Sequence, residues 1–329
     1  MVAGIGTLDL LKAVNEAELS PQTKTNYKNA CSALVSKANG GNDGNDSKAI
    51  TINQILMNPD TYIPLFKKWY PKSTSFKVHL SIILGLFRYN NKQLKGKKYE
   101  VIREKWSTVF KAADAEVTAR YETNKPTERQ EEGYVEYAKI VSARDELPPG
   151  SIKRVLLGMY THLRPMRCEY ARMAIYKTGA PSSGGETDVE PNYIVLKTGR
   201  MIIRAFKTSK HHDSYDIALP DALMDDIKRS LDAQPRDWLF VNTSGQPYNQ
   251  MGYTAWTMRV FKAIFKKPLT VSLIRHSFIN TLDFNRLSIK EQKEIALSMG
   301  HTHEMQGQYR LFFDNKGDCE GNCEPKSMK

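Results

Sequence analysis

The sequence predicts a mainly helical α+β protein of two domains, a helical N-terminal domain and a second domain in which helices surround a small antiparallel β-sheet. Three observations predict this class. The chain has 329 residues, a length for which two domains are the default expectation. Apolar residues recur at helical spacing through most of the chain. Strand-like segments, in contrast, are confined to residues 193–219.

The N-terminal domain, residues 1–126, is predicted from three amphipathic stretches. The first begins at Ser20-Pro21, because Ser is a favoured N-cap and Pro is tolerated in the first turn, and it ends at Gly40-Gly41. The second follows residues 73–75, and the third carries apolar residues between 102 and 121. All three have the spacing of an amphipathic helix. We therefore expect a small all-helical domain.

Its basic residues are unevenly distributed. The whole chain has a net charge of +12, which indicates a polyanionic partner, nucleic acid before membrane. Residues 72–105 hold nine Lys or Arg and two acidic residues. We predict that this surplus forms a DNA-contacting face, with a merely solvated helix face as the alternative. The candidate DNA-binding residues are Lys72, Lys77, Lys95, Lys97 and Lys98.

Several other classes of protein are not expected. No signal peptide opens the sequence and no apolar run approaches the ~18 residues of a membrane span, so we expect an intracellular protein that resides with DNA. The four cysteines, at 31, 168, 319 and 323, are too few and too scattered for a disulfide framework. The spacing of Cys319 and Cys323 is only loosely of zinc type. No metal and no cofactor are expected.

The second domain, residues 127–313, opens with a polar, acidic joint at 126–132 that precedes its first helical pattern. Residues 134–141, 155–160 and 253–265 have helical patterns. Strand patterns cover 193–196, 201–206 and 215–219. Ser288 and Glu291 form a capping box that begins another helix, and Gly300 is its expected end. Residues 314–329 are expected to be a polar, flexible tail.

Four short segments of this domain carry residues suited to phosphoryl transfer. They are Tyr160-Thr-His-Leu-Arg164-Pro-Met-Arg167-Cys-Glu169-Tyr170, Phe206-Lys207-Thr208, Ser272-Leu-Ile-Arg275-His276-Ser-Phe, and Gly300-His301 followed by Tyr309. An arginine can hold a phosphate bidentately. A histidine, whose ordinary pKa is near neutrality, can accept or donate a proton. A tyrosine can attack phosphorus.

This order of residues resembles the catalytic domain of tyrosine recombinases, the phage-integrase family, over residues 150–313. The N-terminal domain resembles the core-binding domain of that family. The segment Pro-Met-Arg-Cys-Glu-Tyr resembles recombinases of large DNA viruses and mobile elements. The resemblance implies a DNA recombinase or integrase that needs neither ATP nor metal. It also implies a homo-multimer, a tetramer, that acts on paired double-stranded DNA sites, with no membrane partner.

The resemblance implies a role for each residue. Tyr309 would attack the scissile phosphate to give a 3′-phosphotyrosine and a free 5′-hydroxyl. Arg167 and Arg275 would stabilise charge on the phosphate, and Lys207 would protonate the leaving 5′-oxygen. His301 would hydrogen-bond the phosphate and assist the loss of the Tyr309 proton. No Walker-type glycine loop is found, as expected of a reaction without ATP.

Some assignments stay open. The family usually has its first arginine three residues before a glutamate, whereas Arg167 stands two before Glu169, so Arg164 is a rival. Lys210 is similarly a rival of Lys207. Ser272 stands where the family has His or Lys, and its hydroxyl is a candidate phosphate contact that adds no charge.

Two other functions remain as alternatives. A type IB topoisomerase uses the same chemistry as a monomer to relax supercoils. A DNA-binding relative with impaired catalysis is the other alternative, and Ser272 is its only support. Within the arginine segment, His276 is expected to be buried and to face away from Arg275.

Overall fold

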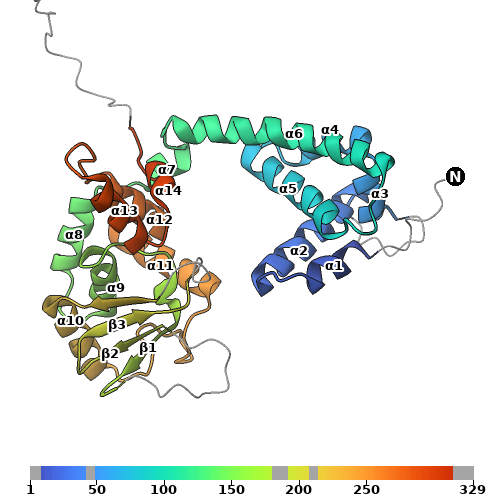
Figure 1. The fold of residues 1–329 in the computed structure, drawn as a ribbon. Helices are drawn as coiled ribbons and strands as arrows, with labels where there is room; N and C mark the ends of the chain where they lie inside the picture. The colour runs from blue at the N-terminus through green and yellow to red at the C-terminus, as the bar shows by residue number, and fades with distance from the viewer. Residues whose placement is uncertain (1–8, 42–48, 180–191, 207–213, 314–329) are drawn as a thin grey trace, which may run out of the picture. The chain divides into compact units, whose positions relative to one another are not determined.

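The computed structural model describes residues 9–41, 49–179, 192–206 and 214–313. The chain divides into two compact units, Met1–Thr123 and Asn124–Lys329, both visible in Figure 1. Among the described residues no helix has the length and apolar character needed to cross a membrane.

The first unit is all helical in its described part. Its helices are α1 (Leu10–Glu16), α2 (Pro21–Ala38), α3 (Ile52–Met57), α4 (Pro59–Trp69), α5 (Ser73–Tyr89) and α6 (Lys97–Glu122). α2 begins as predicted, with the Ser20 side chain accepting from Thr23 N and Pro21 as first residue. α1, α3 and α4 were not predicted, although Thr51 and Gln54 form a capping box that signals the start of α3.

Trp106 of α6 lies at the centre of the first unit. Its side chain is fully buried, its indole Nε1 donates to the carbonyl of Leu56 at 2.9 Å, and its ring lies 5.4 Å from that of Phe66. Replacing such a residue by alanine typically costs about 3–5 kcal/mol. α6 therefore has a fixed face toward the core. Its opposite face and its first turn, which begins after Gly96, remain available to solvent.

The second unit combines helices with one four-stranded sheet, which confirms the predicted α+β class. Its elements are α7 (Glu128–Gly133), α8 (Tyr137–Glu146), α9 (Ile152–Thr161), the 3-10 helix η1 (Glu169–Arg172), β1 (Met173–Tyr176), β2 (Asn192–Val195), β3 (Arg200–Ile203), β4 (Tyr215–Ala218), α10 (Asp221–Ala233), α11 (Gln250–Phe265), α12 (Val271–Ile279), α13 (Ile289–Ser298) and α14 (His303–Gly307). α7 occupies the segment expected to be a joint, and a capping box of Thr127 and Gln130 starts it.

The sheet differs from the prediction in one respect. β2, β3 and β4 match the three predicted strands and pair antiparallel. β1 was not predicted, and it pairs with β2 in parallel, with Met173 opposite Asn192. The sheet is therefore mixed rather than antiparallel. Four residues without an alternating pattern give no strand signal by themselves, and β1 is held on its other side by Leu239 N, which donates to Met173 O.

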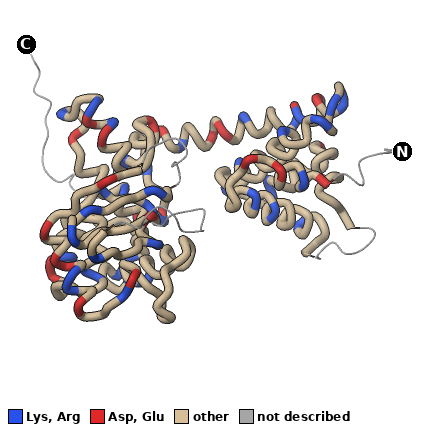
Figure 2. Tube along the Cα trace, turned by 60° about the horizontal axis from the view of Figure 1, so that its bottom comes forward, with Lys and Arg blue, Asp and Glu red and all other residues tan. Residues whose placement is uncertain are grey.

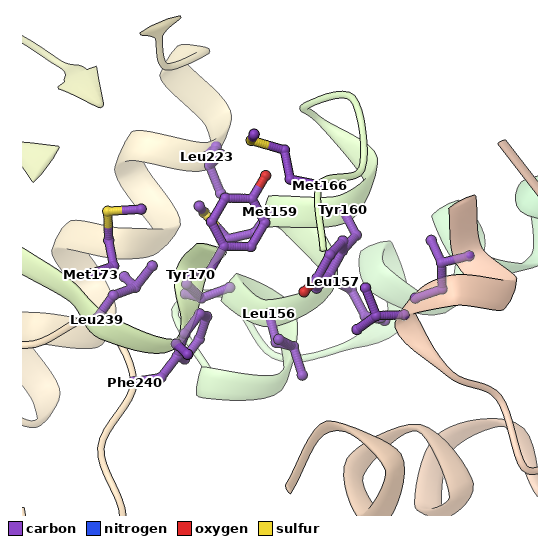
Figure 3. Packing of buried hydrophobic residues seen from close by; sticks show 14 of the residues in the cluster. Leu156, Leu157, Met159, Tyr160, Met166, Tyr170, Met173, Leu223, Leu239 and Phe240 are labelled. Atoms are coloured by element: carbon purple, nitrogen blue, oxygen red, sulfur yellow. The ribbon is translucent and has the colours of Figure 1, made fainter. Parts of the chain in front are cut away.

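The core of the second unit also fixes the segment that carries Arg167. Figure 3 shows Tyr160, Tyr170 and Phe240 packed together with Leu156 and neighbouring apolar side chains. The Tyr160 hydroxyl donates to the carbonyl of Arg167 at 2.9 Å. Buried tyrosines need such partners because an unpaired hydroxyl is costly to desolvate. The turn after α9 is thus tied to the core at Arg167.

Candidate active site

Arg275 is the buried centre of the candidate site. α12 begins where the Thr270 side chain accepts from Leu273 N, and its apolar residues carry Arg275 into the interior with only 1% of its surface exposed. A buried guanidinium requires hydrogen-bond acceptors. Nη1 donates to the carbonyls of Pro165 and Met299, each at 2.8 Å. Arg275 therefore joins three segments that are far apart in the sequence.

Gly300 ends α13 as predicted and shapes the next part of the site. Its φ of +68° lies in the left-handed region, which glycine adopts without strain. In this turn Gly300 N donates to Leu297 O and His301 N to Ala296 O. The carbonyl of Gly300 accepts a hydrogen bond from Arg167 Nη1 at 2.7 Å. One turn thus orients both Arg167 and His301.

His301 is neutral and presents a hydrogen-bond donor. Its Nδ1 lies 2.7 Å from Arg275 Nη2, and because a guanidinium can only donate, Nδ1 accepts and the ring proton resides on Nε2. Burial, followed by the charges of Arg275 and Arg167, lowers the pKa of His301 to about 3. Nε2 is buried and has no hydrogen-bond partner among the described residues. The ring therefore has one donor to offer.

Tyr309 lies against these groups. Its half-buried ring stacks on the His301 ring, with centroids 5.1 Å apart and planes 14° apart. The guanidinium carbon of Arg275 lies 4.9 Å from the tyrosine ring centroid. Burial raises the pKa of the phenol, but the charges of Arg275 and Arg167 and their hydrogen bonding outweigh burial and hold the pKa below its usual value. The ionised phenol is the form that this environment stabilises.

His276 is buried, as expected, and its ring reaches Tyr309, the residue that Arg275 also contacts. Its Nδ1 donates to the backbone carbonyl of Tyr309 at 2.6 Å, and its ring centroid lies 4.8 Å from that of the tyrosine. Neighbouring residues of α12 therefore contact both the side chain and the main chain of Tyr309. One signal of this role is present in the sequence, a polar residue inside a strongly apolar helix.

Glu169 is a further acidic group beside the two arginines. Burial raises the pKa of its carboxyl, while the charges of Arg167 and Arg275 lower it. Its Oε2 is buried without a partner among the described residues. Tyr215, at the start of β4, donates from its hydroxyl to Leu297 O at 2.9 Å and so ties the sheet to α13.

The remaining candidates lie in different places. Arg164 is exposed and donates from Nη1 to Ser298 Oγ at 3.0 Å, so it faces α13 and not Tyr309. Ser272 is exposed in the first turn of α12, and its hydroxyl has no partner in the described part of the chain. Lys207 and Lys210 lie outside the described residues, between the end of β3 and the start of β4.

The candidate DNA-binding lysines lie in the first unit. Lys95, Lys97 and Lys98 are exposed in the turn before α6 and in its first residues, and Lys72 is exposed at the N-cap of α5. Lys77 forms an ion pair with Asp114. Figure 2 shows that basic positions occur in both units and are interspersed with acidic positions.

The described residues contain no group of three or more His, Cys, Asp or Glu side chains that could hold a metal ion. Cys319 and Cys323 lie outside the described residues, as do His211 and His212.

The chain matches no family model and no curated protein. Among solved structures it resembles a lambda integrase tetramer bound to a Holliday junction, with a TM-score of 0.52, 16% identity, and coverage of 97% of this chain and 78% of that one. It also resembles a lambda integrase dimer bound to a COC′ core site, with a TM-score of 0.51, 17% identity, and coverage of 96% and 78%. Over nearly its whole length, the chain has a fold similar to that of lambda integrase.

Proposed function

We propose that the protein is a site-specific DNA recombinase or integrase that cuts and rejoins double-stranded DNA through a 3′-phosphotyrosine at Tyr309. One observation carries the proposal: Arg167, Arg275 and His301 converge on a tyrosine whose pKa is lowered by the two arginines. A tyrosine that merely packs in a core has its pKa raised by burial, as Tyr170 has. Tyr309 has the opposite shift, which is the shift a nucleophile requires.

The reaction is a transesterification. Tyr309 loses its proton to solvent, and the phenolate oxygen attacks the scissile phosphorus. A phosphorus–oxygen bond to the tyrosine forms while the bond to the 5′-oxygen breaks, and that oxygen takes a proton, which we assign to Lys207 on the basis of the sequence resemblance. In the reverse direction Lys207 takes back the proton of the 5′-hydroxyl as its oxygen attacks the phosphotyrosine phosphorus, and Tyr309 leaves as the phenolate. The phosphotyrosine conserves the energy of the broken ester, so rejoining needs no ATP.

The donors of the site suit a phosphate. Arg275 Nε and His301 Nε2 are both buried without partners in the described structure, and an unsatisfied buried donor costs about 1–3 kcal/mol. The non-bridging oxygens of a phosphate would satisfy both. Two guanidiniums would also stabilise the charge that accumulates on these oxygens in the transition state.

The DNA partner is proposed on separate grounds. The net charge of +12 and the exposed lysines Lys72, Lys95, Lys97 and Lys98 suit a phosphate backbone. Lambda integrase, whose fold this chain shares, binds a core site as a dimer and a Holliday junction as a tetramer. We propose that this protein likewise assembles as a homotetramer on paired DNA sites.

Covalent trapping tests the proposal. The protein is incubated with a pool of nicked duplexes of randomised sequence around the nick, and denaturing gels detect an SDS-stable adduct. We expect an adduct from the wild type and from Tyr248→Phe, which alters another half-buried tyrosine, but none from Tyr309→Phe. An adduct with Tyr309→Phe would mean that another residue is the nucleophile. A second assay uses a supercoiled plasmid that carries none of the duplex sequences recovered in adducts. If the monomeric protein relaxes this plasmid efficiently, a type IB topoisomerase is favoured instead.

A further inference from the structure

The segment that follows Tyr309 is bonded to α12 through Asn280. Asn280 Nδ2 donates to Leu311 O at 3.0 Å, and Leu311 N donates to Asn280 Oδ1 at 3.0 Å. Because a backbone N–H only donates and a carbonyl only accepts, this pair of bonds fixes the orientation of the side-chain amide. The asparagine side chain thus occupies both main-chain groups of Leu311, as a neighbouring β-strand would.

His276 makes the companion contact one helical turn earlier. Its Nδ1 donates to Tyr309 O. His276 of α12 and Asn280, the C-cap residue that directly follows the helix, are four apart and hold residues two apart on the segment. His276 and Asn280 are one helical turn apart and so project from the same face, which lets them hold both residues of the segment at once. Arg275, next to His276 on the same helix, faces the phenol of Tyr309.

Further contacts within the second unit hold the rest of this segment. The Leu311 side chain is only 6% exposed, and Phe312 N donates to Asn124 O at 2.9 Å. The Phe313 ring lies 4.2 Å from that of Tyr134. Residues 309–313 are therefore docked on their own chain, and Asn280 and His276 are the anchors that act closest to the phenol.

We propose that Asn280 is a positioning residue for strand cleavage: together with His276 it holds Tyr309–Phe313 against α12, so that the phenol stays beside Arg275 and Arg167 of its own chain. This inference rests on the proposed function of Tyr309. Catalysis by transesterification depends on the alignment of the attacking atom, and a misplacement of about 1 Å costs on the order of 100-fold in rate. Asn280 touches no reacting atom: its side chain bonds both main-chain groups of Leu311 and also donates, at 3.3 Å, to the hydroxyl of Tyr134, whose ring packs on Phe313.

The test compares Asn280→Ala and Asn280→Asp with a matched control. Asp keeps the acceptor for Leu311 N but loses the donor to Leu311 O and to the hydroxyl of Tyr134. Asn39 offers the control, because in the first unit its side chain makes the same reciprocal pair with Ile50, at 2.9 and 2.8 Å. Single-turnover trapping on nicked duplexes gives the rate of adduct formation separately from the amplitude, which reports the fraction of active protein. DNA affinity is measured in parallel.

We expect Asn280→Ala to form the Tyr309 adduct roughly 10- to 100-fold more slowly, with unchanged amplitude and DNA affinity, and Asn280→Asp to be slowed as well. Asn39→Ala should react at the wild-type rate. In Asn280→Ala the phenol of Tyr309 should lie farther from the guanidiniums of Arg275 and Arg167, whose charges lower its pKa. The midpoint of the pH–rate profile should therefore also move upward. A variant that merely destabilised the fold would lose amplitude without moving this midpoint, and that outcome, or a wild-type rate, would overturn the inference.

A second measurement separates failure of this inference from failure of the proposed function. Without DNA, the phenol of Tyr309 is titrated by absorbance as the difference between each protein and its Tyr309→Phe counterpart. Asn280→Ala should move this titration toward the ordinary tyrosine value of ~10. A wild type that forms no adduct contradicts the recombinase, whereas an unmoved titration contradicts the role of Asn280.

Discussion

Arg275 Nη2 donates to His301 Nδ1 at 2.7 Å, and this bond decides which proton His301 can handle. With Nδ1 accepting that bond, the only N–H of the neutral ring is at Nε2, which has no partner in the described structure. The ring therefore presents one N–H donor, which the proposed function would direct at a phosphate oxygen. In this tautomer neither ring nitrogen has a free lone pair for the proton of Tyr309, so we propose the donor role and not the proton-accepting one. The pKa of Tyr309 is itself lowered, because the charges of Arg275 and Arg167 outweigh burial.

The first prediction concerns this donor role. His301→Gln can place an amide N–H near the position of Nε2, whereas His301→Ala has no donor. We expect single-turnover adduct formation to fall roughly 100- to 1,000-fold in His301→Ala, the usual cost of removing one transition-state donor, and by clearly less in His301→Gln. Equal rates for the two variants would argue for a proton-transfer role that glutamine cannot perform.

The second prediction concerns stability in acid. The folded pKa of His301 is lowered to about 3, whereas an unfolded histidine titrates near 6.5. The stabilising contribution of the neutral ring is therefore fully present above pH ~6.5 and is lost as the pH falls toward 3. In urea unfolding followed in the second unit, His301→Gln should show a weaker loss of stability across this window, by up to about 1.4 kcal/mol per pH unit. Matching slopes in the two proteins would show that His301 is not buried as a neutral ring.

The third prediction uses two arginines three residues apart. Arg167 donates to the Gly300 turn beside Tyr309, whereas Arg164 donates to Ser298 on α13. We expect Arg167→Ala to slow adduct formation roughly 100- to 1,000-fold and to move the pH–rate midpoint upward, because one of the charges that lowers the Tyr309 pKa is gone. Arg164→Ala should keep the wild-type midpoint and a rate near that of the wild type. The reverse pattern would make Arg164 the catalytic arginine.

Arg275, His301 and Tyr309, which the sequence singled out by residue type and spacing, lie together in the structure. Gly300 and the Ser288–Glu291 capping box predicted both ends of α13, since capping is a local interaction. Local chemistry of this kind is readable from one chain.

Contacts between distant segments were not readable. β1 depends on pairing with β2 and with the segment around Leu239, so its four residues carry no signal of their own. Of the two arginines, Arg167 donates to Gly300 O and Arg164 donates to Ser298, and nothing local in the sequence distinguishes them. The contact of His276 is with the main chain of Tyr309, 33 residues later in the sequence. Each of these is decided by tertiary structure rather than by local propensity.

The fourth prediction follows from the position of Tyr309 beside the arginines of its own chain. Tyr309→Phe lacks the nucleophile and keeps the arginines, and Arg275→Ala has the reverse defect. If the tyrosine reacts in the site of its own subunit, mixing the two variants should restore no adduct on the nicked duplexes. The control is a mixture of wild type and Tyr309→Phe, which should give adduct in proportion to the wild-type fraction. Recovery of adduct by the two defective variants together would mean that one subunit supplies its tyrosine to another.

The fifth prediction concerns the lysines in the turn before α6 and at its start. Lys95, Lys97 and Lys98 are exposed, and removing one lysine that binds a DNA phosphate should reduce the slope of log K against log salt by roughly 0.9. The triple alanine variant should therefore bind duplexes of different sequence more weakly and with a flatter salt dependence in a titration from about 50 to 200 mM salt. The matched control replaces three other exposed lysines of the same unit, Lys12, Lys28 and Lys111. If both triple variants flatten the slope equally, the effect is one of net charge, and the start of α6 is not the DNA-contacting face.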